Sequence, residues 1–299
     1  MRFHAVFSVS DYDLGATLSS GQAFRWDLRD GWWEGVVAKR WVRLQNLGGA
    51  IVAEMVEPVS DWDWLKDYLQ LEIDLASIVE TFPQDEPMRL SAASCTGLRL
   101  LRQEPWECLA SFILSSTKQI VQIRQIVAML CERFGQPIPA PSGRQPAYGF
   151  PSFGQIAEVS EQDLRACKMG FRAPYLRGAA RMIANGEIDL EKIRSMPLDE
   201  ARLELEKLPG VGRKIADCVL LFGYGFQQAF PVDVWVMKAL QQLYFPKRRV
   251  KLQRLRKFSE THFGPNAGYA QQYLFHYMRV ANQPRTTKTA QVQPRTGRK

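Results

Sequence analysis

The stretch EKLPGVGRKIADCVLLFGYGFQQAFPVDVWVMKAL, residues 206–240, decides the fold. A helical pattern ends near Leu208, where Pro209 and Gly210 interrupt it. A second helix follows, and its apolar side chains recur with helical spacing: Ile215, Cys218, Val219 and Phe222. The stretch therefore predicts a helix-hairpin-helix, two helices joined by a tight turn.

The turn of this hairpin offers main-chain groups to a ligand. Gly210 and Gly212 let the chain bend and let a neighbour approach the backbone closely. The N–H groups at the start of the second helix have no acceptor inside the helix and can bind a phosphate oxygen. The candidate residues for this contact are Gly210, Val211, Gly212 and Arg213. Such a contact ignores base sequence and suits a DNA backbone. Taken alone, these residues are also compatible with a plain helix–helix turn.

Two side chains beside the hairpin are candidates for chemistry. Lys214 lies in the first turn of the second helix, where the helix dipole disfavours a cation and favours a free amine that can form a Schiff base. Asp233 precedes a helix predicted over 234–243 and can cap it. Separately, an exposed lysine and a capping aspartate are the simpler interpretations. On either side of one hairpin, the two suggest a nucleophile and its acid–base partner.

The N-terminal part of the chain has short β patterns. Residues 3–9, 32–38, 41–47 and 50–56 are rich in β-branched and aromatic residues with partial alternation, and short turns separate the last three. We expect an antiparallel meander.

From about residue 60 the pattern becomes helical. Pro105 occupies the position at which proline best opens a helix, whereas the Pro- and Gly-rich segment 137–153 predicts a loop. The expected class is α+β, with three parts along the chain: an antiparallel-sheet domain (1–85), an all-α domain that contains the hairpin (86–282) and a disordered basic tail (283–299).

The net charge of +8 is unevenly distributed. Residues 1–100 carry nine basic and fifteen acidic residues, residues 101–282 carry 25 and 16, and the last 17 residues carry five and none. Seven basic residues fall within 247–257. A solvated helix face is one interpretation of that cluster. The asymmetry along the chain instead suggests a surface that meets a polyanion.

Several chemistries are disfavoured by residue supply. The five cysteines form no C-x-x-C pair, and no two of the three histidines have the spacing of helical metal ligands, which argues against a disulfide framework or a metal centre. No apolar run approaches the roughly 20 residues that span a bilayer, and the N-terminus lacks a signal-peptide pattern. We expect an intracellular monomer without a membrane partner.

The hairpin is one of several segments that share a family pattern. LPGVGRKIADC and PVDV carry a Gly/Pro…Asp signature, and four more segments follow a common order: LSSGQAFRWD (18–27), LLRQEPWECLASFILSS (100–116), MGFRAPYL (169–176) and NAGYAQQYLF (266–275). Together they resemble the 8-oxoguanine DNA glycosylase/AP lyase family over residues 5–280. The resemblance implies that duplex DNA is the partner and that the damaged nucleotide is flipped into a pocket. It also implies that Lys214 attacks C1′ while Asp233 stabilises the developing positive charge, and that β-elimination then nicks the strand.

The resemblance also implies how the base is recognised. Gln271 and Phe275 match residues that hydrogen-bond the base edge and stack on its ring, and Cys218 matches the residue on the opposite ring face. Gly21 matches a glycine whose carbonyl accepts the N7 proton, which 8-oxoguanine has and guanine lacks. By spacing alone, Phe275 and Cys218 are compatible with core packing and Gly21 with a simple turn.

The chain departs from the family at the residues that read the opposite base. Thr117 and Gln122 stand where an asparagine and an arginine are usual, whereas Arg172 keeps the third reader. Phe171 replaces the usual tyrosine wedge, and Trp235 replaces a histidine. Because the forked guanidinium is lost, we expect a weaker preference for cytosine opposite the lesion.

The expected function is removal of 8-oxoguanine with strand nicking, in base excision repair. No cofactor is expected, although a structural monovalent cation is common at such hairpins. One alternative is a glycosylase for alkylated bases, whose members usually lack a lysine matching Lys214; another is a non-catalytic DNA-binding module. The tail and the 247–257 cluster are expected to add salt-sensitive affinity. The protein should lie with DNA, in the cytoplasm or nucleoid, or in the nucleus if it is eukaryotic.

Overall fold

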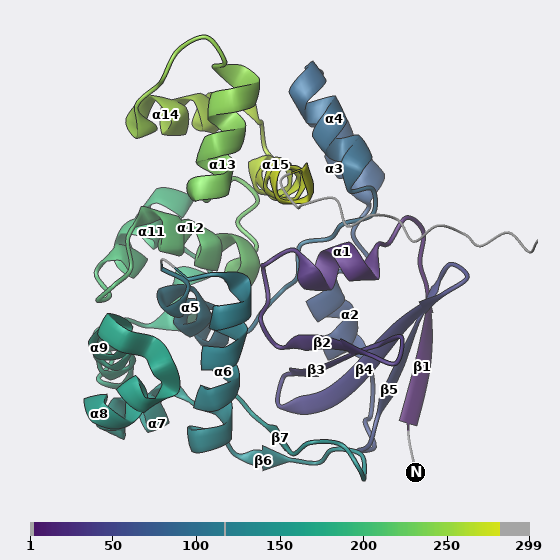
Figure 1. The fold of residues 1–299 in the computed structure, drawn as a ribbon, viewed down its shortest axis with the longest axis vertical. Coiled ribbons are helices and arrows are strands. Elements are labelled where there is room, and N and C mark those ends of the chain that lie inside the picture. Colours follow the sequence, from purple (N-terminus) through teal and green to yellow (C-terminus); the bar gives the residue numbers. More distant parts are fainter. Residues whose placement is uncertain (1–2, 117, 282–299) are drawn as a thin grey trace, which may run out of the picture.

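The computed structural model describes residues 3–116 and 118–281, so Thr117 and the tail from residue 282 lie outside it. A five-stranded antiparallel sheet lies beside a larger helical part (Figure 1). The strands of this sheet are β1 (Phe3–Ser8), β2 (Trp26–Arg29), β3 (Trp32–Val37), β4 (Arg40–Leu47) and β5 (Ala50–Met55). The α+β class is confirmed.

The strand order differs from a simple meander of the four predicted strands. The order is β1-β5-β4-β3-β2, so β1 pairs with β5 at one edge, and the unpredicted β2 pairs with β3 at the other. β2 has four residues, too few for a recognisable alternation. Burial of Trp26 anchors it: the indole N–H donates to the Tyr68 hydroxyl at 2.8 Å, and Gly35 opposite leaves room for the ring, since a Cβ there would meet Trp26 at 2.6 Å.

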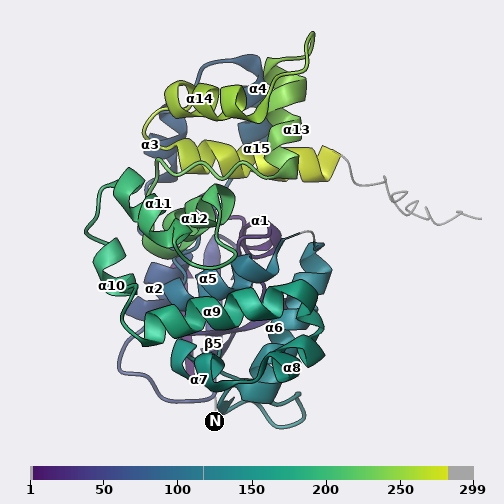
Figure 2. The same cartoon turned by 90° about the vertical axis from the view of Figure 1, so that its left-hand side faces the viewer.

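The helices of the N-terminal third go to two different places. α1 (Leu14–Ser19) and α2 (Asp63–Leu69) pack on the sheet through a shared apolar core (Figure 1). α3 (Leu75–Glu80) and α4 (Glu86–Ser94) lie at the far end of the molecule, beside α15 (Ala267–Ala281) in both views (Figures 1 and 2). A segment of the N-terminal third therefore packs against the last helix, which is far from it in the sequence.

The remaining helices build the larger of the two buried cores. They are α5 (Pro105–Leu114), α6 (Ile120–Phe134), α7 (Phe153–Glu158), α8 (Glu161–Leu164), α9 (Ala173–Ala184), α10 (Leu190–Ile193), α11 (Leu198–Glu206), α12 (Arg213–Val219), α13 (Val234–Ala239) and α14 (Leu252–His262). Short π-helical turns follow α8, α12 and α13 (Arg165–Met169, Leu220–Tyr224 and Leu240–Tyr244), and a 3-10 turn (Gly170–Arg172) precedes α9. None of the helices within 3–116 and 118–281 has the length and apolar character needed to cross a membrane.

The predicted helix at Pro105 is confirmed, with Glu104 as its cap. The Glu104 carboxylate accepts the N–H groups of Trp106 and Glu107, and Pro105 lacks the donor that would otherwise be left over. The predicted loop 137–153 contains a small hairpin, β6 (Pro137–Ile138) and β7 (Ala147–Tyr148).

A half-buried ion pair ties the sheet side to the helical core. Arg25, just before β2, places Nη1 3.2 Å from Glu107 Oε2 on α5 and also donates to the Tyr148 carbonyl. Burial raises the pKa of Glu107, and the guanidinium of Arg25 acts against that rise. Each partner depends on the other, because an isolated charge at this depth is costly.

We predict that Glu107→Leu lowers the free energy of unfolding by about 1–3 kcal/mol, because the half-buried Arg25 guanidinium loses its charged partner and keeps only the Tyr148 carbonyl. The double variant Arg25→Met/Glu107→Leu should recover much of that loss. Urea unfolding of the wild type, both single variants and the double variant measures the coupling. Simple additivity of the two single effects would contradict the pairing.

Candidate active site

A cavity of about 420 Å³ opens among the Gly21 turn, α5, α6, α12, α13 and α15. This volume lies in the usual range for small-ligand sites. Its lining includes all six residues that the sequence predicts for catalysis and base binding: Gly21, Lys214, Cys218, Asp233, Gln271 and Phe275. Segments from both ends of the chain thus meet at one concave site.

Lys214 enters the cavity from the first turn of α12. Its Nζ donates to Ser115 Oγ at 3.3 Å and lies 5.2 Å from the centroid of the Phe112 ring. The side chain is half-buried, so the amine is held at the wall of the cavity rather than in bulk solvent. One hydrogen-bond acceptor and one aromatic face define its direction.

Asp233 caps α13, as the sequence predicts. Its Oδ1 accepts the N–H of Val236 at 2.8 Å. Burial raises the pKa of Asp233 above the ordinary aspartate range, while the capping N–H and the Lys214 ammonium act against that rise. The helix predicted over 234–243 is α13 with its π-helical continuation. The carboxylate and the amine thus face the same space and feel each other's charge.

The wall formed by α15 carries a buried polar group without a partner. Gln271 is 4% exposed, and its Oε1 makes no hydrogen bond within the described part of the chain. Such an acceptor is unfavourable unless a ligand completes it. Phe275 lines the same wall one helical turn further on. A flat molecule with N–H groups at its edge would satisfy both side chains.

The opposite wall is small and neutral. Cys218 is buried, and burial raises the pKa of its thiol to about 12, so it stays protonated at neutral pH. Gly21 has φ +81°, and a Cβ there would lie 2.7 Å from Ile120 Cδ1. The positive φ therefore favours glycine at position 21, whereas the Ile120 methyl group, at the end of a flexible side chain, could move aside. We refer to the space lined by Gly21, Cys218, Gln271 and Phe275 as the base slot.

The residues predicted to meet the opposite base lie outside this cavity. Phe171 is 53% exposed, and the Arg172 guanidinium lies over its ring, with Cζ 4.2 Å from the centroid. Arg172 itself is 2% exposed and donates to the Met169 carbonyl at 3.2 Å. Gln122 is exposed, and its Oε1 accepts the N–H of Gln119 at 3.1 Å, so it caps α6.

The hairpin forms between α11 and α12, as predicted. Gly210 has φ +79°, and a Cβ there would lie 2.8 Å from Tyr175 Cβ, so the turn packs tightly on α9. Gly212 caps α12 and faces open space, whereas Val211 is buried. Arg213, predicted to contact DNA, already places Nη2 2.6 Å from Glu260 Oε1. The Arg213 guanidinium therefore already has an anionic partner within the protein.

Sequence reasoning missed three groups that contact this cavity. Phe112 and Ser115 of α5 orient Lys214, and Arg279 of α15 joins the lining. Arg279 had a detectable signal, because it continues the four-residue spacing of Gln271 and Phe275. No local pattern connects α5 to Lys214, because that contact depends on how helices pack.

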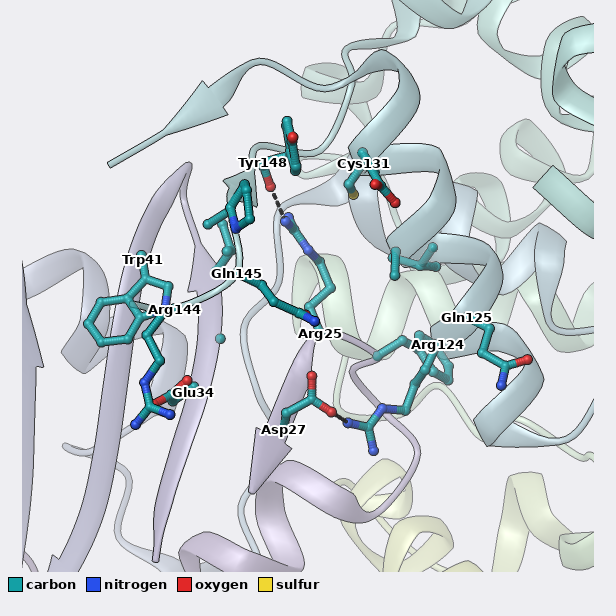
Figure 3. A pocket seen from close by; sticks show the side chains of 18 of the residues that line it. Arg25, Asp27, Glu34, Trp41, Arg124, Gln125, Cys131, Arg144, Gln145 and Tyr148 are labelled. Atoms are coloured by element: carbon teal, nitrogen blue, oxygen red, sulfur yellow. Dashed lines mark hydrogen bonds and ion pairs between the residues drawn. The ribbon is translucent and has the colours of Figure 1, made fainter. Parts of the chain in front are cut away.

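A larger cavity, about 750 Å³, lies between the sheet, α6 and the β6–β7 hairpin (Figure 3). Its charged side chains pair with neighbours: Arg124 with Asp27, and Arg144 with Glu34 at 3.0 Å. None of the residues predicted for function lines it. The smaller cavity is therefore the candidate active site.

Both parts of the chain match family models. Residues 5–109 match the N-terminal domain of 8-oxoguanine DNA glycosylase, and residues 110–262 match the HhH-GPD superfamily base excision DNA repair protein. These matches together span most of the sheet, the hairpin and the cavity lining up to Trp235, and they end before α15.

Whole-chain relatives agree with these matches. A probable N-glycosylase/DNA lyase of Methanothermobacter thermautotrophicus is 31% identical over 91% of this chain and 95% of that protein. The N-glycosylase/DNA lyase OGG1 of Arabidopsis thaliana is 31% identical over 89% and 77%. The Clostridium acetobutylicum 8-oxoguanine glycosylase/lyase, solved with double-stranded DNA containing cytosine opposite 8-oxoguanine, superposes with a TM-score of 0.86 at 34% identity, over 91% and 93% of the two chains.

Proposed function

Because the chain belongs to the 8-oxoguanine DNA glycosylase/AP lyase family, we propose how its own residues carry out that family's reaction. The protein is a DNA N-glycosylase with lyase activity. It removes 8-oxoguanine from duplex DNA and cleaves the strand at the abasic site. Inside the cell it acts on the chromosome, as a monomer, in the nucleoid or nucleus.

Lys214 is the proposed nucleophile. Its Nζ forms a bond to C1′ of the everted nucleotide as the C1′–N9 bond breaks and its electron pair leaves with the base. Opening of the sugar ring then gives an imine. Because the imine acidifies C2′, loss of a C2′ proton expels the 3′ phosphate and nicks the strand. The contacts of Nζ with Ser115 and the Phe112 ring support this role, since they hold the amine at the cavity wall.

Asp233 is the proposed electrostatic partner. Positive charge develops on the sugar as the base departs, and a fixed carboxylate in a water-poor cavity stabilises it strongly. The capping bond to Val236 holds this carboxylate in place before substrate arrives. A residue that caps a helix and lines a cavity needs little reorganisation during the reaction.

The observation that carries the assignment is the unpartnered Oε1 of Gln271 inside the base slot. A guanine-type edge supplies N–H donors to this oxygen, and the Phe275 ring offers a stacking face. The Gly21 carbonyl would accept the N7 proton that distinguishes 8-oxoguanine from guanine. Guanine would instead place a lone pair against that oxygen.

Borohydride trapping tests the function. Protein and a duplex with a single 8-oxoguanine, reduced during turnover, should give a covalent protein–DNA adduct and a nicked product. A non-catalytic module would bind without an adduct. An alkylated-base glycosylase would release 3-methyladenine and leave 8-oxoguanine in place.

We propose no metal or cofactor in catalysis. The described residues contain no cluster of three or more His, Cys, Asp or Glu side chains that could hold a metal ion. A monovalent cation at the hairpin would depend on main-chain oxygens such as that of Leu208, which already accepts the N–H of Val211 at 3.1 Å and has a second lone pair. Such an ion would support the DNA-binding turn.

We predict a weak preference for the base opposite the lesion. The side-chain oxygen of Gln122 already accepts a hydrogen bond in the cap of α6. Gln122 also lacks the guanidinium of arginine, whose two parallel donors discriminate between base edges. Single-turnover excision of 8-oxoguanine opposite each of the four bases should give rates within about tenfold of one another. A strong preference for cytosine would show that Arg172 alone suffices for reading.

A further inference from the structure

Arg279 bridges the two walls of the base slot. It lines the cavity from the same face of α15 that carries Gln271 and Phe275. Its Nη1 donates to the Ser19 carbonyl at 3.2 Å, and its Cζ lies 5.5 Å from the centroid of the Phe275 ring. One guanidinium thus contacts the backbone of one wall and the aromatic ring of the other.

The Ser19 contact acts directly on the Gly21 turn. Ser19 ends α1, and Gly21 follows two residues later. The φ of Gly21 is +81°, a value that residues with a side chain rarely adopt. A Cβ at Gly21 would lie 3.5 Å from Arg279 Nη1, so the guanidinium rests against this turn. α1 lies next to α15 in both views (Figures 1 and 2).

A second bond from α15 reaches the same turn. Gln272, which is 2% exposed, donates from Nε2 to the Ser20 carbonyl at 3.2 Å. Gln22 anchors the far side of the turn, because its Oε1 accepts the Leu101 N–H at 2.8 Å. The turn that presents the Gly21 carbonyl is therefore held by partners outside it. Gln272 and Arg279 both line the cavity, and Arg279 is the one whose side chain also lies over the Phe275 ring.

The charge of Arg279 is not used in an ion pair. Within residues 3–116 and 118–281, Arg279 forms no salt bridge, although its charge lowers the pKa of Asp233 against the effect of burial. Burial in turn lowers the pKa of Arg279 itself. A cation placed here without a carboxylate partner is better explained by its contacts with the two walls.

We propose that Arg279 is a positioning residue that determines base specificity, because it holds the Gly21 carbonyl at a set distance from the Phe275 ring. The inference rests on the proposed function. A base that stacks on Phe275 meets the Gly21 oxygen in the correct place only if the spacing between these walls is maintained. A lysine cannot replace Arg279, because its ammonium lacks the planar fork that stacks on a ring while donating in plane.

The test uses the Lys214→Gln protein, which binds DNA without turnover, and three duplexes. One carries 8-oxoguanine, one carries guanine at the same place, and one carries a tetrahydrofuran abasic analogue that leaves the base slot empty. Adding Arg279→Met or Arg279→Lys should lower the 8-oxoguanine-to-guanine affinity ratio by about tenfold, the loss typical of one charge-assisted hydrogen bond. Affinity for guanine and for the abasic analogue should stay the same.

A matched control removes a different cation, one that lies outside the cavity but over the ring of Trp235, which lines it. Lys238 Nζ lies 5.3 Å from the centroid of the Trp235 ring, so Lys238→Met loses a cation–π contact but no link to the Gly21 turn. It should leave the affinity ratio unchanged. Because the ratio compares two ligands of one protein sample, partial unfolding does not move it.

Three results would overturn the inference. An unchanged ratio in both Arg279 variants removes its role in specificity. An equal loss of affinity for all three duplexes would make Arg279 a general DNA-backbone contact. A wild-type affinity ratio in Arg279→Lys would show that only the positive charge at position 279 matters. Failure of the proposed function is distinguishable, because the Lys214→Gln parent would then show no preference for 8-oxoguanine at all.

Discussion

Lys214→Gln should abolish borohydride trapping and strand nicking, and slow base release by at least roughly 10³-fold. Glutamine keeps a similar length and polarity but has no nucleophilic amine. Single-turnover assays with a 5′-labelled 8-oxoguanine duplex separate base release from nicking.

The matched control is Lys118→Gln, because Lys118 lines the same cavity and carries the same charge. This variant should still form the trapped adduct. Loss of the adduct in Lys118→Gln, with retention in Lys214→Gln, would make Lys118 the nucleophile and overturn the mechanism. A DNA-binding titration on both proteins confirms that the duplex is still bound.

Asp233→Asn should slow excision by about 10²–10³-fold, because one fixed charge is removed from the place where positive charge develops on the sugar. Asparagine is as good a helix cap as aspartate, so the bond to the Val236 N–H is kept. This variant therefore tests the charge of Asp233 without removing the cap of α13. Single-turnover rates on the 8-oxoguanine duplex measure the effect, and an unchanged rate would exclude an electrostatic role.

The pH profile gives an independent readout of Asp233. Its pKa is raised by burial, so the carboxylate is lost at a higher pH than for an exposed aspartate as pH falls. The wild-type rate should therefore decline on the acid side above the ordinary aspartate range, and Asp233→Asn should lack that decline.

Asp233→Asn should lower activity without lowering the stability of the fold. A raised folded-state pKa means that the folded protein holds the proton more tightly than the unfolded chain, so stability falls as pH rises from the unfolded-state pKa to the folded-state pKa and stays reduced above it. At neutral pH, Asp233→Asn should therefore unfold at the same temperature as the wild type or slightly higher. A large drop in melting temperature would indicate that the activity loss reflects misfolding.

The fold was predictable where a strong local pattern exists. The hairpin at Pro209 and Gly210, the helix opened by Pro105 and the strands β3, β4 and β5 all follow from turn chemistry and periodicity. β2 was not predictable, since its four residues are held by the packing of Trp26 on Tyr68 and Gly35. β1 pairs with β5 at the other edge of the sheet.

The amino-acid sequence alone determined which functional groups are present and how they are spaced locally. They are an amine in the first turn of a helix, a capping carboxylate, a glycine turn, and an amide and an aromatic ring one helical turn apart. Only the tertiary structure decided that Gly21 and Phe275 face each other, that Ser115 orients Lys214, and that Arg279 joins the two walls. The physical reason is range. Caps, turns and helix faces depend on residues a few positions apart, whereas a cavity forms where helices from distant parts of the chain pack, and that packing is a property of the whole core.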